Sequence, residues 1–186
     1  MTARLVLALS AAVALSACGP PWKVVRVSDP SALAGQTDVA VTFDYSQMMV
    51  ENRTLPQWME LKTKDDAKYP QTWADLMARF EAAVLQGLRV QFPDAKLASQ
   101  APGAVTLVVQ PRTFRLGKWA PFVNTQTFMD VVLDFQLNNA STDAISVIRA
   151  YPASVTQPSV FNHVPYVGDG VGRLAGQFLG SKQPQK

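Results

Sequence analysis

The chain has 186 residues, of which 48% are hydrophobic and 17% charged, and its formal net charge is +3 at pH 7. This length suits a single domain with a substantial core, and so small a net charge argues against nucleic acid as a partner. A single cysteine and a single histidine exclude an intrachain disulfide and any site that needs two of either residue.

The first 17 residues are typical of an export signal. Arg4 provides a positive charge, and the uncharged run over residues 5–17 is shorter than the about 20 residues of a membrane-spanning helix. The run ends in Leu15-Ser16-Ala17, directly before Cys18 and Gly19. We therefore predict that residues 1–17 are a signal peptide, and no later apolar stretch is long enough to span a bilayer.

The sequence Leu15-Ser16-Ala17-Cys18 resembles the lipobox of bacterial lipoproteins. The resemblance implies cleavage before Cys18, attachment of acyl chains such as palmitate to that residue, and anchoring in a membrane, which two or more chains hold firmly. Gly19 in place of an aspartate implies the outer membrane, with the domain in the periplasm. An ordinary signal peptide with an incidental Cys18 is the alternative.

Residues 18–22 read as a tether, because two prolines near its start favour extended chain. A short strand is expected over residues 22–27. Residues 38–46 alternate between apolar and polar side chains, which predicts a half-buried strand.

The segment 47–70 is unusually long for a connection between a strand and a helix. Thr54 and Gln57 have the spacing of a capping box, which predicts a short helix here. Met48, Met49 and Trp58 admit two interpretations. Adaptable methionines beside a tryptophan suit a partner-binding surface, and the same side chains suit a flap that completes the core.

Helical spacing of apolar residues predicts the main helix over residues 71–91, and a final helix is expected over 169–180. Between them, strands are predicted over 104–114, 127–137 and 144–155. The turn at 138–143 is rich in hairpin-forming residues, so the last two strands are expected to pair antiparallel.

This order predicts an α+β fold, a two-layer α/β sandwich in which two main helices pack on one face of a mostly antiparallel sheet of 4–5 strands. The domain is expected over residues 23–180, followed by a disordered tail over 181–186. Asp130 and Asp134 would point away from the helices, so one face of the sheet stays hydrated.

Few residues suggest catalysis. His163 is expected in a solvated loop, and a hydrolase acting on peptidoglycan or polysaccharide would have to combine it with Asp130 or Asp134. These two aspartates would stand about 13 Å apart along a strand, beyond the about 5–9.5 Å of paired glycosidase carboxylates. We expect no catalytic residues, no metal and no cofactor.

Two further patterns are candidates for binding. Cations and aromatics gather over residues 112–122, which suggests a patch for an anionic ligand at Arg112, Arg115, Lys118 and Trp119. Glycines recur every four residues through Gly172, Gly176 and Gly180, which indicates a helix that another backbone approaches closely. The helix could dock on its own sheet or form a glycine zipper in a membrane-associated multimer.

A lipobox followed by a small strand–helix–meander–helix domain resembles accessory lipoproteins of bacterial envelope transport and surface-assembly systems. The leading hypothesis is a lipid-anchored, non-enzymatic binding or accessory module for a partner protein or an envelope glycolipid. The hydrolase and the glycine-zipper multimer are the alternatives.

Overall fold

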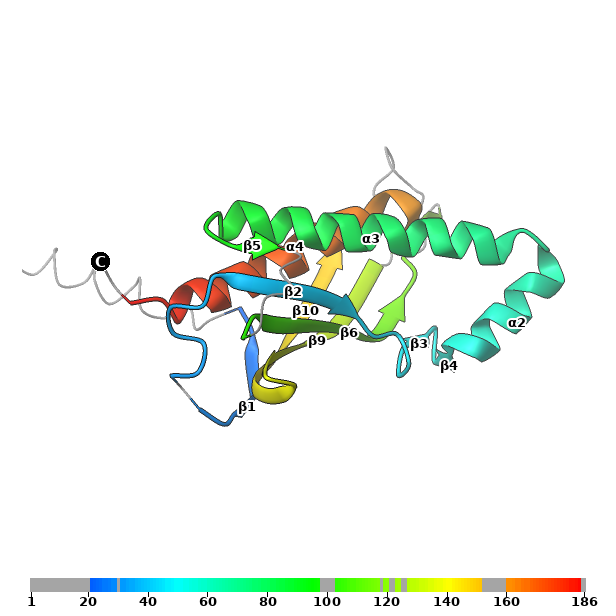
Figure 1. Cartoon of the computed structure of the whole chain (residues 1–186). Coiled ribbons are helices and arrows are strands. Elements are labelled where there is room, and N and C mark those ends of the chain that lie inside the picture. The colour runs from blue at the N-terminus through cyan, green and yellow to red at the C-terminus, as the bar shows by residue number, and fades with distance from the viewer. Residues whose placement is uncertain are drawn as a thin grey trace, which may run out of the picture.

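The structure is a computed structural model that describes residues 21–29, 31–97, 103–117, 119–120, 123–124, 127–151 and 160–184. The expected signal peptide and Cys18 lie outside the described residues. The helices are α2 (Leu55–Asp65), α3 (Tyr69–Gln91) and α4 (Val160–Ser181) (Figure 1). The strands are β1 (Lys23–Val27), β2 (Asp38–Phe43), β3 (Met49–Val50), β4 (Arg53–Thr54), β5 (Lys96–Leu97), β6 (Val105–Arg115), β7 (Trp119–Ala120), β8 (Val123–Asn124), β9 (Thr127–Leu137) and β10 (Ala140–Tyr151).

The fold is α+β, as expected, but the sheet is larger than predicted and mixed. Eight strands follow the order β1-β10-β9-β6-β2-β5, with β3 joined to β6 and β4 to β3, and β7 and β8 pair separately. β1, β10, β9 and β6 are antiparallel, whereas β2 runs parallel to β6 and β5. The predicted number of 4–5 strands was wrong because it omitted the two-residue strands β3, β4 and β5. The sheet is mixed because α3 lies in the connection from β2 to β6, and such a crossover leaves the two joined strands parallel.

The predicted hairpin of the last two long strands is confirmed. β9 and β10 pair antiparallel through the two-residue turn Asn138-Asn139, whose φ angles are 53° and 63°. Two successive positive φ angles define the type I′ turn that matches the twist of a hairpin, and asparagine tolerates this conformation. The turn is shorter than the expected 138–143, so β10 begins at Ala140.

The segment between β2 and α3 is a flap over the core. Its predicted capping box is confirmed at the start of α2, where Thr54 accepts the backbone N–H of Gln57 and the Gln57 side chain accepts that of Thr54. Met48 and Trp58 are buried in the core, which corrects the interpretation of these two side chains as a partner surface, and Met49 is half-buried. Trp58 donates its indole N–H to the Tyr69 hydroxyl at 3.1 Å, which ties α2 to α3.

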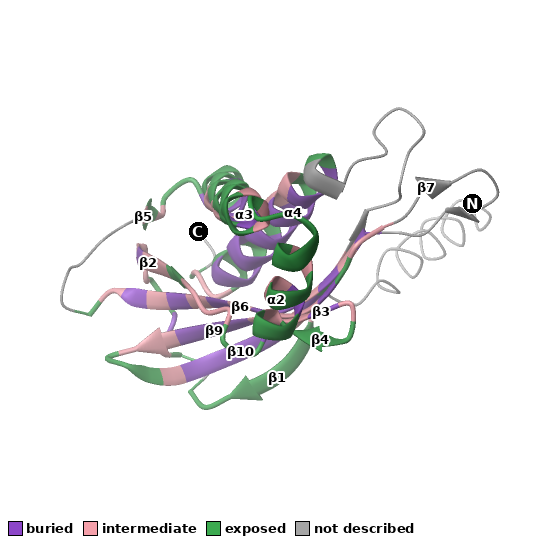
Figure 2. Ribbon diagram, turned by 90° about the vertical axis from the view of Figure 1, so that its right-hand side faces the viewer, coloured by how far each residue is buried: buried purple, intermediate pink, exposed green. Residues whose placement is uncertain are grey.

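α3 and α4 lie side by side on one face of the sheet (Figures 1 and 2). Both have a strongly apolar buried stripe, and every second residue of β6 and β9 meets it from below. The shared core includes Phe80, Val84 and Leu88 from α3, Val171 and Phe178 from α4, and Leu107, Val131, Leu133 and Phe135 from the sheet. The opposite sheet face, called the open face below, carries neither α3 nor α4.

α4 begins at Val160, nine residues before the predicted start at 169. It contains Pro165 and several glycines, residues that normally end or weaken helices. Packing of α4 against α3 and the sheet overrides this local preference. His163 therefore lies on a helix and is buried, which corrects its placement in a solvated loop.

Gly168, Gly172 and Gly176 of α4 serve contact with α3, whereas Gly170 faces the side chain of Arg149 on β10. A Cβ added to Gly168 would lie 2.6 Å from the backbone oxygen of Phe80, and one on Gly172 would collide with that of Val84. A Cβ added to Gly176 would lie 2.8 Å from the Cβ of Gln91, whereas a Cβ added to Gly180 would have no neighbouring atom within 4 Å. The glycine face that the sequence offered for a zipper is thus covered by α3 as far as Gly176.

The chain beyond residue 180 remains attached to the domain as far as it is described. Lys182 forms an ion pair with the buried carboxylate of Asp143 at 3.2 Å, and Gln183 donates to the backbone oxygen of Gln36. At the other end, Trp22, assigned to the tether by sequence, packs edge-on against Phe178 with ring centroids 5.7 Å apart. Trp22 and Lys182, near the two limits of the described residues, therefore both contact Phe178 in the C-terminal half of α4.

Candidate binding site on the open face of the sheet

The two faces of β9 differ in chemistry. Met129, Val131 and Leu133 point into the core, and the residues between them point to the open face, because successive side chains of a strand alternate. Asp130 and Asp134 lie on the open face, as the sequence predicted, and each accepts a hydrogen bond from a serine of β10. Asp134 is nevertheless buried there, which corrects the expectation that it faces solvent. Polar side chains on this face are thus held by neighbouring strands.

A hollow of about 430 Å³ lies on the open face. Its lining comes from four strands that are adjacent in the sheet, β1, β10, β9 and β6. The lining residues are Val25, Arg26, Gln110, Arg112, Val132, Asp134 and Ala144. Two guanidinium groups, one carboxylate and one amide therefore surround an aliphatic floor, and we call this hollow the groove.

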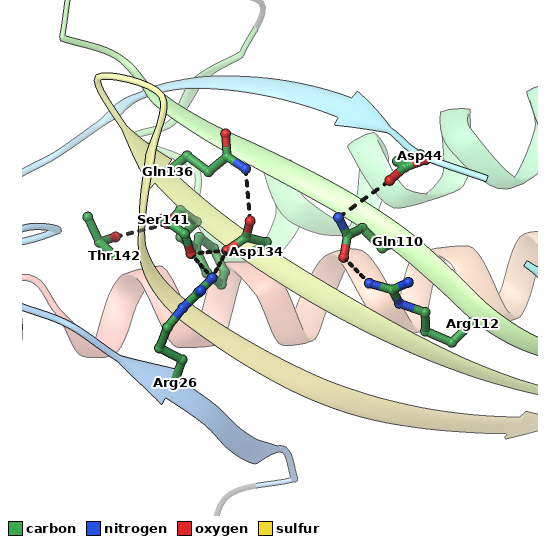
Figure 3. A network of polar contacts seen from close by, with 9 residues as sticks. Arg26, Asp44, Gln110, Arg112, Asp134, Gln136, Ser141 and Thr142 are labelled. Carbon is green, nitrogen blue, oxygen red and sulfur yellow. Dashed lines mark hydrogen bonds and ion pairs between the residues drawn. The ribbon is translucent and has the colours of Figure 1, made fainter. Parts of the chain in front are cut away.

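Asp134 is the centre of the first polar network in the groove (Figure 3). Its carboxylate accepts hydrogen bonds from Arg26 Nη2 at 3.1 Å and from Gln136 Nε2 at 2.8 Å. The Ser141 hydroxyl donates to the same carboxylate and accepts from Arg26. These bonds fix the Arg26 side chain so that it reaches from β1 over β10 to β9.

Arg112 is the centre of the second network (Figure 3). It donates to the side-chain oxygens of Gln110, at 2.7 Å, and of Gln47. Gln110 in turn lies 3.5 Å from Asp44, whose pKa is held below its usual range by hydrogen bonds from Ser46, with the Arg112 charge adding to the effect. Asp44 therefore stays ionised at neutral pH and favours the positive charge beside it.

Arg112 shares the open face with Gln110, two residues before it on β6, and a β-bulge interrupts the strand at this point. The register of β6 against β9 shifts between Pro111 and Thr113, so Arg112 is an extra residue on its strand. Bulges re-aim side chains and are frequent beside functional sites, and proline, which lacks an N–H, is tolerated at such positions. Alternation from Val105 onward places Arg112 on the open face, and the bulge changes the alternation only after it, so that Phe114 points into the core.

The structure divides the predicted patch for an anionic ligand. Arg112 belongs to the groove, whereas Arg115 is exposed and lies 3.5 Å from the side-chain oxygen of Asn52 in the β3–β4 turn. Lys118 and the side chain of Trp119 lie outside the described residues. Of the four, only Arg112 is placed in the groove.

His163 is not brought together with either aspartate of the open face. Its Nδ1 lies 3.1 Å from the hydroxyl of Thr127, and both side chains are buried. Thr127 also accepts the N–H of Gly117, so this cluster fixes the start of β9 on the helix side of the sheet. The catalytic pairing considered for a hydrolase therefore spans the two faces and does not form.

Within the described ranges, no three His, Cys, Asp or Glu side chains gather where they could hold a metal ion. Sequence reasoning named Arg112 for an anionic ligand and considered Asp134 only as a partner of His163 in a hydrolase, and it missed Arg26 and Gln110. Arg26 stood in an expected strand, and its partner lies 108 positions further along the chain. For Gln110, the only signal in the sequence was that a polar residue interrupts an apolar run.

No protein-family model matches the chain, and neither does any curated protein. Among solved structures, the chain is similar to the PelC dodecamer from Paraburkholderia phytofirmans, with 11% identity over 82% of this chain and 95% of that one, and a TM-score of 0.42. It is also similar to protein XCC0632 from Xanthomonas campestris, of family DUF330, with 15% identity over 84% of this chain and 92% of that one, and a TM-score of 0.44. At these values, neither similarity carries an inference about function.

Proposed function

We propose that the chain is a lipid-anchored protein of the bacterial envelope that acts as a non-enzymatic binding module for a partner protein. The anchor is Cys18, the membrane is the outer membrane, and the domain lies in the periplasm. The observation that carries the binding role is the groove, a hollow of about 430 Å³ with hydrogen-bonded charges on the open face. None of the described helices is both long and apolar enough to cross a membrane.

The chemistry of the groove fits a protein surface. Arginine is enriched at protein interfaces, and charged groups around an aliphatic floor are typical of their mixed composition. Arg26 and Arg112 are both held in place by hydrogen bonds before any partner binds, which lowers the entropy lost on binding. An envelope glycolipid is the second ligand that the same guanidinium groups could bind, through its phosphates.

The first test concerns the anchor. We expect Cys18→Ser to abolish incorporation of radiolabelled palmitate and to shift the protein from the membrane fraction to the soluble fraction, because no other thiol is present for acylation. Membrane retention with an altered cleavage site would contradict the anchor. Cys18→Ala serves as the second variant, since alanine also lacks the sulfur.

The second test concerns the groove. A photo-crosslinking amino acid at Val132, in the floor, is expected to give an adduct of defined mass in intact cells. The same probe at Val90, an exposed position on α3, is the control. Arg112→Glu should reduce the Val132 adduct by about tenfold, the effect of losing about 1.4 kcal/mol of binding free energy.

Equal adducts at Val132 and Val90, or an adduct at Val132 that Arg112→Glu leaves unchanged, would contradict the groove as the binding site. An adduct whose mass identifies a glycolipid would assign the second ligand in place of a protein.

A further inference from the structure

Strand β1 has no buried side. All five of its residues are exposed, and its three valines Val24, Val25 and Val27 expose 50%, 57% and 44% of their surface. A strand with one side in a core would alternate between buried and exposed residues. Figure 2 shows β1 exposed along its length at the edge of the sheet, on the side away from α3 and α4.

The apolar surface continues onto the neighbouring strand. Ile148 on β10 is 62% exposed and lines a shallow hollow of about 220 Å³ together with Trp22 and Lys23, at the start of β1. Lys23 and Arg26 are the charged residues within β1, and both are positive. We call β1 together with Ile148 the β1 edge. Exposed aliphatic side chains flanked by cations are the composition of a surface that binds anionic membranes.

The chain length between the anchor and β1 restricts where this edge lies. Lys23 is five residues after Cys18, so even a fully extended tether spans at most about 18 Å. Trp22 packs against Phe178, which fixes the point at which the tether enters the domain. If Cys18 is acylated, the start of the β1 edge at Lys23 is held within this distance of the bilayer surface.

We propose that the β1 edge lies against the bilayer, with its valines and Ile148 in the interfacial region and Lys23 beside anionic headgroups. This inference rests on the proposed anchor. Arg26 contributes less charge, because it is paired with Asp134 at 3.1 Å. The groove shares Val25 and Arg26 with the β1 edge, so it would open beside the membrane surface.

The test measures partition into lipid vesicles. The chain from Cys18 onward, which holds every described residue, is given one alkyl chain of 14 carbons through a thioether on its sole sulfur. A single chain binds membranes only marginally, so an added protein contact is measurable. We expect Val25→Asp/Val27→Asp to lower the partition coefficient into phosphatidylglycerol-containing vesicles by about tenfold or more.

Two matched variants sharpen the result. Val90 on α3 is 54% exposed, so Val90→Asp makes a similar change elsewhere and should alter partition by less than about twofold. Lys23→Gln should lower partition about fivefold on anionic vesicles, the effect of losing about 1 kcal/mol, and should have no effect on zwitterionic vesicles. Circular dichroism checks that each variant is folded.

Equal losses for Val25→Asp/Val27→Asp and Val90→Asp, or no loss for Lys23→Gln, would overturn the proposal. Self-association without vesicles that Val25→Asp/Val27→Asp abolishes would also overturn it and assign the β1 edge to a second copy of the chain. Because the alkyl chain is attached chemically, this result does not depend on processing in the cell. Failure of the Cys18→Ser test would leave the vesicle measurement intact, so the two failures are distinguishable.

Discussion

Gly172→Ala is expected to lower the free energy of unfolding by about 1–3 kcal/mol, the usual effect of overpacking a close contact. A Cβ at this position would collide with the backbone oxygen of Val84 and lie 2.8 Å from the backbone N of Leu88. Backbone atoms of a packed helix cannot rotate away as a flexible side chain can. α3 and α4 would have to separate, and the core between them would loosen.

Gly180→Ala is the matched control on the same helix. Gly180 has nothing within 4 Å, so the methyl group meets no neighbour. The higher helix propensity of alanine should then stabilise the protein by about 0.5 kcal/mol. Chemical denaturation measures the free energy of unfolding of both variants. Relative to the original protein, it should fall for Gly172→Ala and rise for Gly180→Ala.

Gly87 on α3 makes the reciprocal contact, because its added Cβ would collide with the backbone oxygen of Asp169. Once Gly172→Ala has separated the helices, Gly87→Ala should cost less than it does alone, since neighbouring sites are not additive. Strictly additive losses, or a Gly172→Ala variant as stable as the original protein, would contradict the close helix contact.

Lys182→Met should destabilise the protein by about 3 kcal/mol or more, because removing one member of a buried ion pair leaves the other charge uncompensated. The Asp143 side chain is fully buried, and that of Lys182 is 19% exposed. Lys182 also lies 5.0 Å from the ring centroid of Phe178. Among the described residues, no hydrogen-bond donor reaches the second carboxylate oxygen of Asp143, so nothing else there replaces the lysine.

The control is Lys64→Met, which removes an exposed lysine paired with Glu60 on α2. Exposed pairs of this spacing contribute only about 0.3–0.5 kcal/mol, so its effect should be small. Adding Asp143→Leu to Lys182→Met should restore most of the lost stability, since an apolar pair can replace a buried ion pair. A loss below about 1 kcal/mol for Lys182→Met, or no recovery in the double variant, would show that the pair has little role in stability.

Local patterns determined much of this fold in advance. The capping box at Thr54, the alternation of β9 and the hairpin beyond it all depend on residues within a few positions of one another. These interactions form in the same way whatever surrounds them. The α+β class and the two helices on one face follow from the same patterns, as does the placement of Asp130 and Asp134 on the open face.

Other features depended on residues far apart in the chain. Pro165 and the glycines of α4 read as helix breakers, yet close approach to α3 requires small residues there, so the helix extends back to Val160. The parallel pairing of β2 with β6 follows from the path of α3, which periodicity does not reveal. For Met48 and Trp58 the sequence left both a partner surface and a flap over the core open, and packing placed both side chains in the core.

Residues close together in the chain were enough to predict the anchor at Cys18 and the local elements of the domain, and the composition excludes a second thiol or histidine. Three features depend on long-range packing: Arg26 meets Asp134 in the groove, Lys182 pairs with Asp143, and β1 stays exposed. The physical reason is the same in each case. A local signal depends on near neighbours and backbone geometry, whereas the environment of a charge or of an edge strand depends on which distant segments fold against it.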